Sequence, residues 1–148
     1  MSVVENIIKN KIVAVIRGND KEEALNIIEG AIEGGIKLIE VTYTNKDASE
    51  IIESLLGKYE DVVIGAGSVL NVNTAREAVG PSYIKAIKAP IKDVKVMVTG
   101  GVNLENLKKW LNSGADSVGI GSILTSGTDG DKAKIAENAR RFMEKVGE

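Results

Sequence analysis

Two residue types that carry much of enzyme chemistry are missing from this chain: its 148 residues include no cysteine and no histidine. The absence of cysteine excludes a disulfide framework, a thiolate nucleophile and a metal held by thiolates. The absence of histidine removes the commonest metal ligand and the commonest general base near neutral pH. We therefore expect no metal site, and chemistry falls to lysine, carboxylate and hydroxyl side chains, to the backbone or to a borrowed cofactor.

The chain has no excess of positive charge, and aromatic side chains are scarce. The formal net charge is −2, and aromatic residues make up 3% of the chain. A chain without a basic field or stacking platforms is not typical of proteins that bind nucleic acids or anionic lipids. No apolar run approaches the length of a membrane span, and the first ten residues lack the apolar core of a signal peptide. These features predict a cytoplasmic protein that binds neither nucleic acid nor membrane.

The order of the apolar segments predicts one α/β domain over residues 1–148. Short apolar strands flanked by glycine alternate with amphipathic helices five times. This pattern is typical of parallel strands joined by helical crossovers, with ligands at the carboxyl ends of the strands. The predicted strands are residues 12–16, 38–42, 62–67, 96–98 and 118–120. The predicted helices follow a lead-in at 2–10. The first is capped by Asn19 or Asp20, the next starts at Asp47, another begins at Asn73 or Thr74, and further ones lie at 83–87, 104–111 and 132–146.

Two glycine turns follow the last two predicted strands. The first is Thr-Gly-Gly at 99–101, after a strand expected to be buried on both faces, and Asn103 is expected to cap the next helix. The second is Gly-Ile-Gly-Ser at 119–122. Glycines at such ends let backbone N–H groups approach an anion closely. Two of them at the ends of consecutive parallel strands predict a phosphate site, and tight turns without a ligand are the alternative.

Several separated motifs resemble those of one known family. Their order is similar to that of bacterial 2-keto-3-deoxy-6-phosphogluconate (KDPG) aldolases, a family that also includes 4-hydroxy-2-oxoglutarate (KHG) aldolases. The motifs are KIVAVIR at 11–17, IEVT at 39–42, GAGSVL at 65–70, GP at 80–81, TGGV at 99–102 and GIGS at 119–122.

The resemblance implies a TIM (β/α) barrel, of which this chain would form a partial version with about five β-α units. Members are usually trimeric lyases that cleave a keto acid to pyruvate and an aldehyde through a lysine Schiff base, without a cofactor. The implied ligand is a small keto acid or a phosphorylated sugar acid, as in Entner–Doudoroff carbohydrate metabolism. Inorganic phosphate or sulfate could occupy the same site.

The resemblance also implies roles for residues at matching positions. Glu40 matches the acid/base glutamate of the family, and a strand-end glutamate paired with a lysine is the alternative. Arg17 matches a residue that holds the substrate carboxylate or phosphate, and its planar guanidinium suits either anion; a solvated arginine is the alternative. The other residues expected to bind substrate or phosphate are Thr42, Ser68, Thr99, Gly100, Gly101, Gly121 and Ser122.

The chain departs from the family between Val79 and Gly80, where three β-α units are missing. The missing part includes the strand with the Schiff-base lysine, because this sequence has no Lys-x-Phe-Pro and its one phenylalanine is Phe142. Thr44 stands where many relatives have a second anion-binding arginine. A natural deletion, an engineered deletion and a segment omitted from the sequence would each explain the gap.

No other lysine is expected to replace the missing one. A Schiff-base amine must be buried and must face the ligand. Lys85, Lys88 and Lys92 lie on or after a predicted helix, whereas Lys37 and Lys95 precede strands, at the wrong end for the site. We therefore expect aldol cleavage to be lost or very slow, while binding of a phosphate or keto acid is retained.

Removing three units from a barrel would leave the strands in the order four-five-one-two-three, with strands three and four as open edges. The sheet could stay open and be covered by residues 72–90, close into a smaller barrel, or pair its edges with those of a second chain. We favour an open or partial barrel that forms a homo-oligomer. The inward residues that need cover in every case are Val13, Val15, Val63, Val96 and Val98.

Three functions remain open at this point. The first is that of an aldolase-family lyase with damaged activity. The second is a non-catalytic module that binds phosphate or a sugar phosphate at the two glycine turns. The third is an engineered barrel fragment with neither activity nor ligand.

Overall fold

The structure is a computed structural model, which describes residues 3–42, 44–67 and 95–148. The parts of the predictions that concern Ser68, the helices at 73–87 and the cover at 72–90 lie outside these residues. The strands are β1 (Ile12–Ile16), β2 (Leu38–Thr42), β3 (Val63–Gly67), β4 (Met97–Thr99) and β5 (Ser117–Ile120). The helices are α1 (Val3–Asn10), α2 (Lys21–Glu33), α3 (Ala48–Leu55), α5 (Leu107–Asn112), α6 (Ser122–Thr125) and α7 (Lys132–Gly147).

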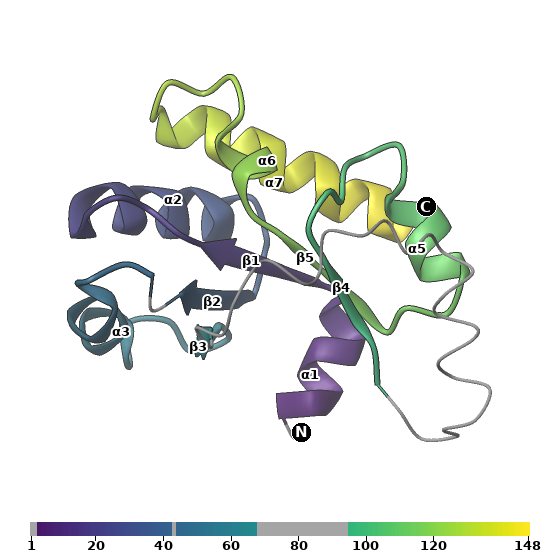
Figure 1. Cartoon of the computed structure of the whole chain (residues 1–148), viewed down its shortest axis with the longest axis horizontal. Coiled ribbons are helices and arrows are strands. Elements are labelled where there is room, and N and C mark those ends of the chain that lie inside the picture. Colours follow the sequence, from purple (N-terminus) through teal and green to yellow (C-terminus); the bar gives the residue numbers. More distant parts are fainter. Residues whose placement is uncertain (1–2, 43, 68–94) are drawn as a thin grey trace.

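The five strands form one parallel sheet in the order β3-β2-β1-β5-β4 (Figure 1). This is the predicted order of a barrel from which three consecutive units have been removed, and it is confirmed. Among the described residues β3 and β4 are the two edges, so the sheet is open. The prediction of an α/β partial barrel is therefore confirmed.

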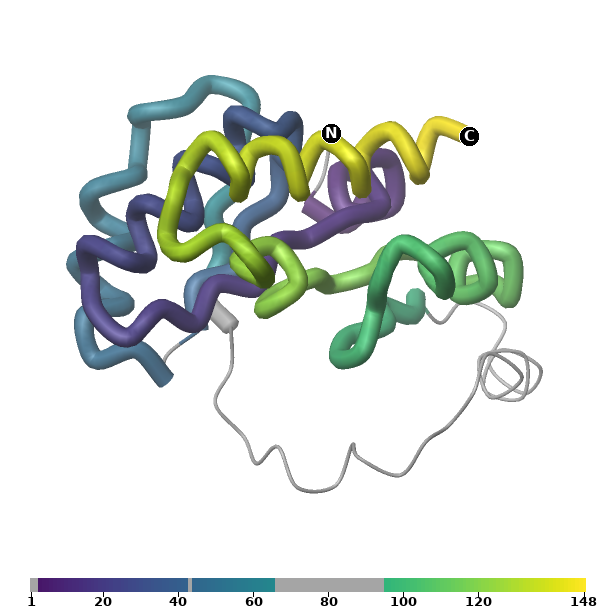
Figure 2. Tube along the Cα trace, turned by 90° about the horizontal axis from the view of Figure 1, so that it is seen from above, coloured from purple at the N-terminus to yellow at the C-terminus, as the bar shows by residue number. Residues whose placement is uncertain are grey.

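Helices α2 and α7 cover one face of the sheet, and α1 lies on the opposite side of it (Figures 1 and 2). The alternation of β1 explains the core: Ile12, Ala14 and Ile16 are at most 1% exposed and belong to the cluster packed under the helices. Phe142 of α7 is part of the same cluster. Burial of these apolar side chains is the main source of stability for such a layer.

The contact between α2 and α7 is unusually close because α2 has glycine where the helices meet. A Cβ at Gly30 would lie 2.7 Å from Cγ2 of Ile135, and one at Gly34 would lie 2.2 Å from Cβ of Ala139. Small residues on facing helices let the two backbones approach. This close contact holds α7 against α2, the helix of the chain's first β-α unit.

Two of the predicted helix starts are confirmed in position, and the first of them also has the expected side-chain cap. Asp20 caps α2, and its Oδ1 accepts a hydrogen bond of 2.9 Å from the backbone N–H of Glu23. Asp47 precedes α3, without a side-chain cap bond. The prediction that Asn103 caps a helix beginning at Leu104 is wrong, because α5 starts only at Leu107.

The late start of α5 follows from local hydrogen bonds. Oδ1 of Asn103 accepts from the backbone N–H of Asn106 at 2.9 Å, and Oδ1 of Asn106 accepts from the backbone N–H of Asn103 at 2.8 Å. Asparagine side chains compete with helical backbone bonds in this way. A turn therefore occupies the three residues that the apolar spacing assigned to a helix.

The prediction of a strand buried on both faces at 96–98 is also wrong. Strand β4 begins at Met97, which is 39% exposed, and Val96 precedes it. It is an edge strand with only β5 beside it among the described residues, so its apolar side chains are not covered on both faces.

The face to which Val98 belongs also differs from the prediction. Thr99 pairs with Gly119, which in turn pairs with Val13, so Thr99 shares the inner face with Val13. Val98 is offset by one residue and packs against the core under the helices. Because successive side chains of a strand alternate between faces, a one-residue error reverses the prediction. The inward placement of Val13, Val15 and Val63 is confirmed by the strand register.

Candidate functional site

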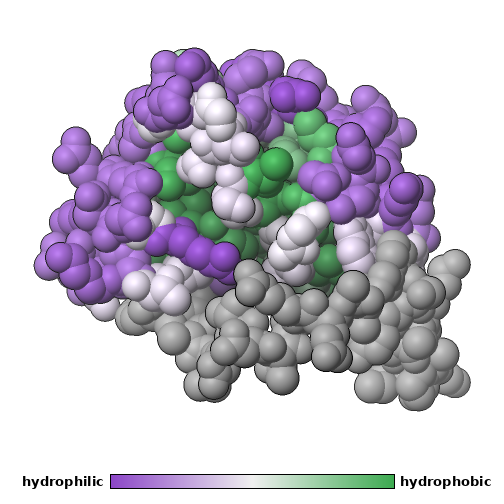
Figure 3. Space-filling view, turned by 45° about the horizontal axis from the view of Figure 1, so that its top comes forward, coloured by the Kyte–Doolittle hydropathy of each residue, from purple (hydrophilic) through white to green (hydrophobic). Residues whose placement is uncertain are grey.

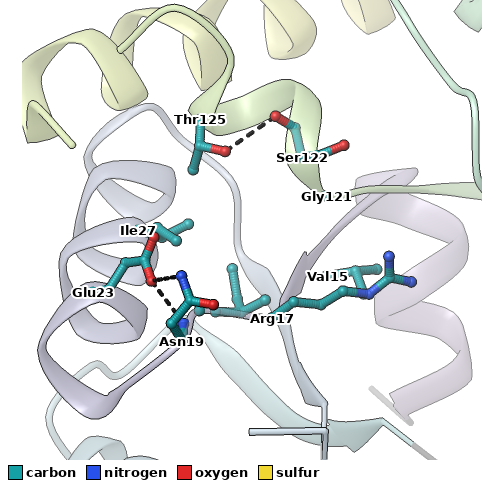
Figure 4. Close-up of a pocket in the computed structure, with 10 residues that line it drawn as sticks. Val15, Arg17, Asn19, Glu23, Ile27, Gly121, Ser122 and Thr125 are labelled. Carbon is teal, nitrogen blue, oxygen red and sulfur yellow. Dashed lines mark hydrogen bonds between the residues drawn. The ribbon is translucent and has the colours of Figure 1, made fainter. Parts of the chain in front are cut away.

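The carboxyl ends of β1 and β5, which are paired neighbours, form the rim of a pocket of about 200 Å³ (Figure 4). Two of the predicted binding elements, Arg17 and the Gly121–Ser122 turn, meet here. A space-filling view shows that apolar surface on this side of the molecule is gathered in a hollow between hydrophilic side chains (Figure 3). The pocket is lined by Val15, Ile16, Arg17, Gly18, Asn19, Glu23, Ile27, Gly121, Ser122 and Thr125.

Polar groups approach the pocket from three elements. Arg17 extends past Val15 along the end of β1, and Ser122 and Thr125 of α6 lie across from it (Figure 4). At a third side the carboxylate of Glu23 accepts hydrogen bonds from Asn19, from its backbone N–H at 2.7 Å and from its Nδ2 at 2.9 Å. The hydroxyl of Thr125 donates to the carbonyl oxygen of Ser122 at 3.1 Å, so Arg17 and the Ser122 hydroxyl are the groups of the lining that suit an oxyanion.

The glycines of β5 bring backbones close together at this edge. A Cβ at Gly121 would lie 3.2 Å from the carbonyl oxygen of Val15, and one at Gly119 would lie 2.7 Å from Cγ2 of Thr99. Packing therefore favours glycine at both positions, more strongly at Gly119 than at Gly121. Packing alone therefore accounts for the glycines of the second turn, and no ligand is needed to explain them. The pocket beside the turn is a separate observation.

Glu40 lies beside the pocket on the same face of the sheet. It pairs with Val15, which lines the pocket, and on its other side with Gly65. Paired residues of parallel strands point to the same face, so the Glu40 side chain shares the inner face with Val15. It is half-buried, as expected for an inward carboxylate at the centre of β2.

Thr42 is 8% exposed and its hydroxyl is used inside the protein. Oγ1 of Thr42 donates to the carbonyl oxygen of Ile16 at 3.0 Å and lies 2.8 Å from Oγ1 of Thr44. Thr42 is thus next to Arg17 but does not line the pocket. The predicted role of Thr42 in substrate binding stays a prediction.

The first glycine turn lies at the end of the neighbouring strand but does not line the pocket. Thr99 pairs with Gly119, so the turns follow adjacent strands, as predicted. Gly100 and Gly101 are exposed and have φ angles of 83° and 70°, which favour glycine. The two turns are neighbours, and only the second contributes to the pocket.

No lysine among the described residues lines the pocket. Lys37 and Lys95 lie before β2 and β4, as predicted, and form ion pairs with Asp61 and Asp116. Lys85, Lys88 and Lys92, like Ser68, fall outside the described residues. Within the described ranges no group of three or more acidic side chains could hold a metal ion.

Four polar residues at this edge were missed by the sequence analysis. Asn19 was considered only as a helix cap, and Glu23 could have been found from the Asp-x-x-Glu spacing at 20–23, which resembles a capping box. Thr125 was missed because α6 has only four residues. Asn45, which is 4% exposed, follows a strand end but matches no motif.

The ionisable groups with shifted pKa values lie away from the pocket. A hydrogen bond from Lys58, together with the charges of Lys58 and Lys132, holds the pKa of Glu29 below its ordinary value against the opposing effect of burial. The hydrogen bond and charge of Lys37 likewise lower the pKa of Asp61. These shifts belong to ion pairs at the surface.

An open parallel α/β barrel with a polar pocket at the carboxyl end of its sheet defines a member of the TIM-barrel class. The family model of KDPG and KHG aldolase matches residues 3–82, and the chain belongs to this family. Among the described residues no helix is long and apolar enough to cross a membrane.

Comparisons with individual proteins agree with this assignment. The chain is 26% identical over 174 residues to the 2-dehydro-3-deoxy-6-phosphogalactonate aldolase of Escherichia coli (strain K12), a match that covers 78% of this chain and 85% of that enzyme. It is 31% identical over 78 residues to a 2-dehydro-3-deoxy-phosphogluconate aldolase of Treponema pallidum, covering 53% of this chain and 37% of that enzyme.

Among solved structures, a native KDPGal structure has a TM-score of 0.77 at 23% identity, covering 92% of this chain and 94% of the other. At this identity the likeness establishes the fold. The predicted family and fold are thereby confirmed.

Proposed function

We propose that the pocket between β1 and β5 binds the phosphate or carboxylate of a phosphorylated 2-keto-3-deoxy sugar acid, without forming a covalent bond to it. The observation that carries this proposal is the meeting of Arg17 with Gly121 and Ser122 around one pocket. The family membership supports the substrate class. Inorganic phosphate is the simplest probe with the same chemistry.

The chain's own groups would act as donors to the anion. Arg17 would supply two parallel N–H bonds and a positive charge, and the Ser122 hydroxyl would donate a further bond from the opposite rim. The nearby backbone is close-packed around Gly121, which keeps these donors in place without cost at binding.

Glu40 would be the proton-transferring group if a keto acid extended from the pocket along the inner face. Its carboxylate lies one strand from Val15 on that face. A half-buried carboxylate can hold or release a proton at a substrate hydroxyl. This role depends on a substrate carbonyl that is activated elsewhere.

We further propose that the activating amine is absent and that aldol cleavage is lost or very slow. The family's reaction needs a lysine that forms a Schiff base with the keto group, and none of the described lysines reaches the pocket. The match to the E. coli enzyme spans 174 residues, whereas this chain has 148, which supports a loss of internal barrel units. We therefore expect the chain to bind the anion and not to cleave the substrate.

Phosphate titration of the purified chain, followed by calorimetry and by thermal stabilisation, tests the binding proposal. We expect saturable binding that Arg17→Gln weakens by about tenfold, the loss expected for a charge-assisted contact. Arg140→Gln is the matched control, because Arg140 is an exposed arginine of α7 paired with Glu137 and remote from the pocket. Equal effects of the two substitutions, or no phosphate binding, would reject the proposal.

The open edges favour a second proposal, that the chain forms a homo-oligomer. Strands β3 and β4 each have a neighbour on one side only among the described residues, and unpaired strand edges pair readily with another chain. Light scattering coupled to size-exclusion chromatography tests this. A mass of 15.7 kDa at all protein concentrations would contradict it.

A further inference from the structure

We propose that Asn45 is a positioning residue that fixes Arg17 for binding at the pocket, an inference that rests on the proposed function. Asn45 lies in the connection from β2 to α3, and it is 4% exposed. It neither lines the pocket nor matches a family motif quoted above. Its hydrogen bonds nevertheless end on the loop that presents Arg17.

The side chain of Asn45 donates hydrogen bonds to the backbone of this loop. Nδ2 of Asn45 donates to the carbonyl oxygen of Gly18 at 2.8 Å and to that of Asp20 at 3.3 Å. A buried amide that satisfies two carbonyl groups of one loop holds that loop in a single conformation. Because Gly18 directly follows Arg17, these hydrogen bonds fix the backbone from which the Arg17 side chain extends.

Asn45 is itself held rigidly. Its Oδ1 accepts from the backbone N–H of Asp47 at 2.8 Å, and its backbone N–H donates to the carbonyl oxygen of Thr42 at 3.1 Å. These two bonds fix both the amide orientation and the main chain. Asn45 is therefore a rigid support that is anchored on the end of β2.

Thr42 holds the other side of Arg17. Its Oγ1 donates to the carbonyl oxygen of Ile16 at 3.0 Å. The residues on either side of Arg17 are thus both held by their carbonyl groups. Thr42, at the end of β2, bonds to Ile16, and Asn45, three residues later, bonds to Gly18. This arrangement extends the positioning role to Thr42, whose predicted contact with the ligand stays a prediction.

The remaining side of the loop is packed on α2. A Cβ at Gly18 would lie 2.9 Å from the backbone nitrogen of Ala24, and Glu23 accepts two hydrogen bonds from Asn19. The loop is thereby confined between β2 and the first turn of α2. Arg17 is exposed, as are Asn19 and Asp20, and it is the one cationic side chain of residues 17–20.

The test is a double-mutant cycle with inorganic phosphate as the probe, on the full chain. Asn45→Ala should weaken phosphate binding by about three- to tenfold, the cost of ordering a free arginine at binding. In the Arg17→Gln background the same substitution should change the dissociation constant by less than about twofold, because its effect passes through Arg17. A purely structural role would give additive effects.

Asp116→Ala is the matched control for lost stability. Its Oδ2 accepts from the backbone N–H of Val96 at 2.8 Å, at the opposite end of the sheet from the pocket. This substitution should lower the melting temperature and leave the phosphate dissociation constant within about twofold of the original. Hydrogen exchange of residues 17–20 gives a readout without ligand, which Asn45→Ala should accelerate and Asp116→Ala should not.

A second substitution covers the case in which Asn45→Ala does not fold. Thr42→Val keeps the shape of the side chain and removes the bond to Ile16, so it should reproduce the weaker binding and the faster exchange. Thr42→Ser, which keeps the hydroxyl, should restore both.

The two proposals fail in different ways. Phosphate binding that Arg17→Gln leaves unchanged would reject the proposed function. It would also remove the proposed role of Asn45, since that role depends on Arg17. Phosphate binding that depends on Arg17 but is unchanged by Asn45→Ala and Thr42→Val would overturn the positioning role alone.

Discussion

At the scale of single residues, the glycines of the sheet differ in what surrounds them. A Cβ at Gly119 would meet Cγ2 of Thr99 at 2.7 Å and Cγ2 of Val15 at 3.1 Å. At Gly65, on the same face, a Cβ would meet only the carbonyl oxygen of Ile39, at 3.9 Å, among the described residues. Two glycines that look equivalent in the sequence therefore have different reasons to be there.

Gly119→Ala should lower the free energy of unfolding by about 1–3 kcal/mol, because the new methyl group overpacks the inner face. Thr99→Ser removes Cγ2 and should recover part of this loss in the double variant. Gly65→Ala is the control, with a change of less than about 1 kcal/mol. Urea denaturation of the four proteins measures these values, and equal losses for the two glycine variants would contradict the packing argument.

The ion pairs of Glu29 give a pH dependence of known sign. Its carboxylate is 2.9 Å from Nζ of Lys58 and 3.5 Å from Nζ of Lys132, and the hydrogen bond from Lys58 is the main reason that its pKa is lowered. A carboxyl group whose pKa is lowered by folding stabilises the protein above its unfolded pKa of about 4.3 and loses this as the pH falls through the folded pKa.

Glu29→Gln should therefore lower the melting temperature at neutral pH by no more than about 4 °C, since the pairs are partly exposed. The difference from the original chain should shrink as the pH falls from about 5 to about 3. Thermal denaturation at several pH values checks this. A difference that persists unchanged at the acid end would show that Glu29 acts through packing and not through its charge.

At the scale of elements, the pairing of α2 with α7 depends on glycine in α2. A Cβ at Gly34 would lie 2.2 Å from Cβ of Ala139 and 2.5 Å from the carbonyl oxygen of Ala136. The φ angle of Gly34 is −76°, so alanine is compatible with the backbone and only packing opposes it. The two helices join the start of the chain to its last helix.

Gly34→Ala should destabilise the protein by about 3 kcal/mol, because backbone and not a flexible side chain would have to move. Gly147→Ala, in a helix end with nothing within 4 Å of the new Cβ, should change stability by less than about 0.5 kcal/mol. Chemical denaturation compares them. Similar values would mean that α7 can shift away from α2 at little cost.

Elements set by apolar alternation and by caps could be predicted from the sequence, and those set by local side-chain bonds could not. Strand β1 and the Asp20 cap follow from short-range rules, and the strand order follows from the family resemblance. The start of α5 was mispredicted because Asn103 and Asn106 bond to each other's backbone. The site residues that carry a charge or belong to a motif could be predicted from the sequence. Asn45 could not, because its partner Gly18 lies 27 residues away and no local pattern reveals the contact.

At the scale of the whole molecule, the five strands of the described residues keep the strand order of a barrel without its closure. The order β3-β2-β1-β5-β4 places the ends of β1 and β5 side by side, so the pocket survives the open sheet. Binding and chemistry are therefore separable in this chain: it belongs to the KDPG and KHG aldolase family, and we propose that it keeps the anion pocket without the Schiff-base amine.

The intact mass of the chain after incubation with pyruvate and borohydride tests this separation most directly, with an aldolase that has its Schiff-base lysine as a positive control. Borohydride reduces a lysine Schiff base to a stable adduct, so an enzyme with that lysine gains mass. We predict that this chain stays at 15.7 kDa. A mass increased by one reduced pyruvate on a lysine would contradict the account.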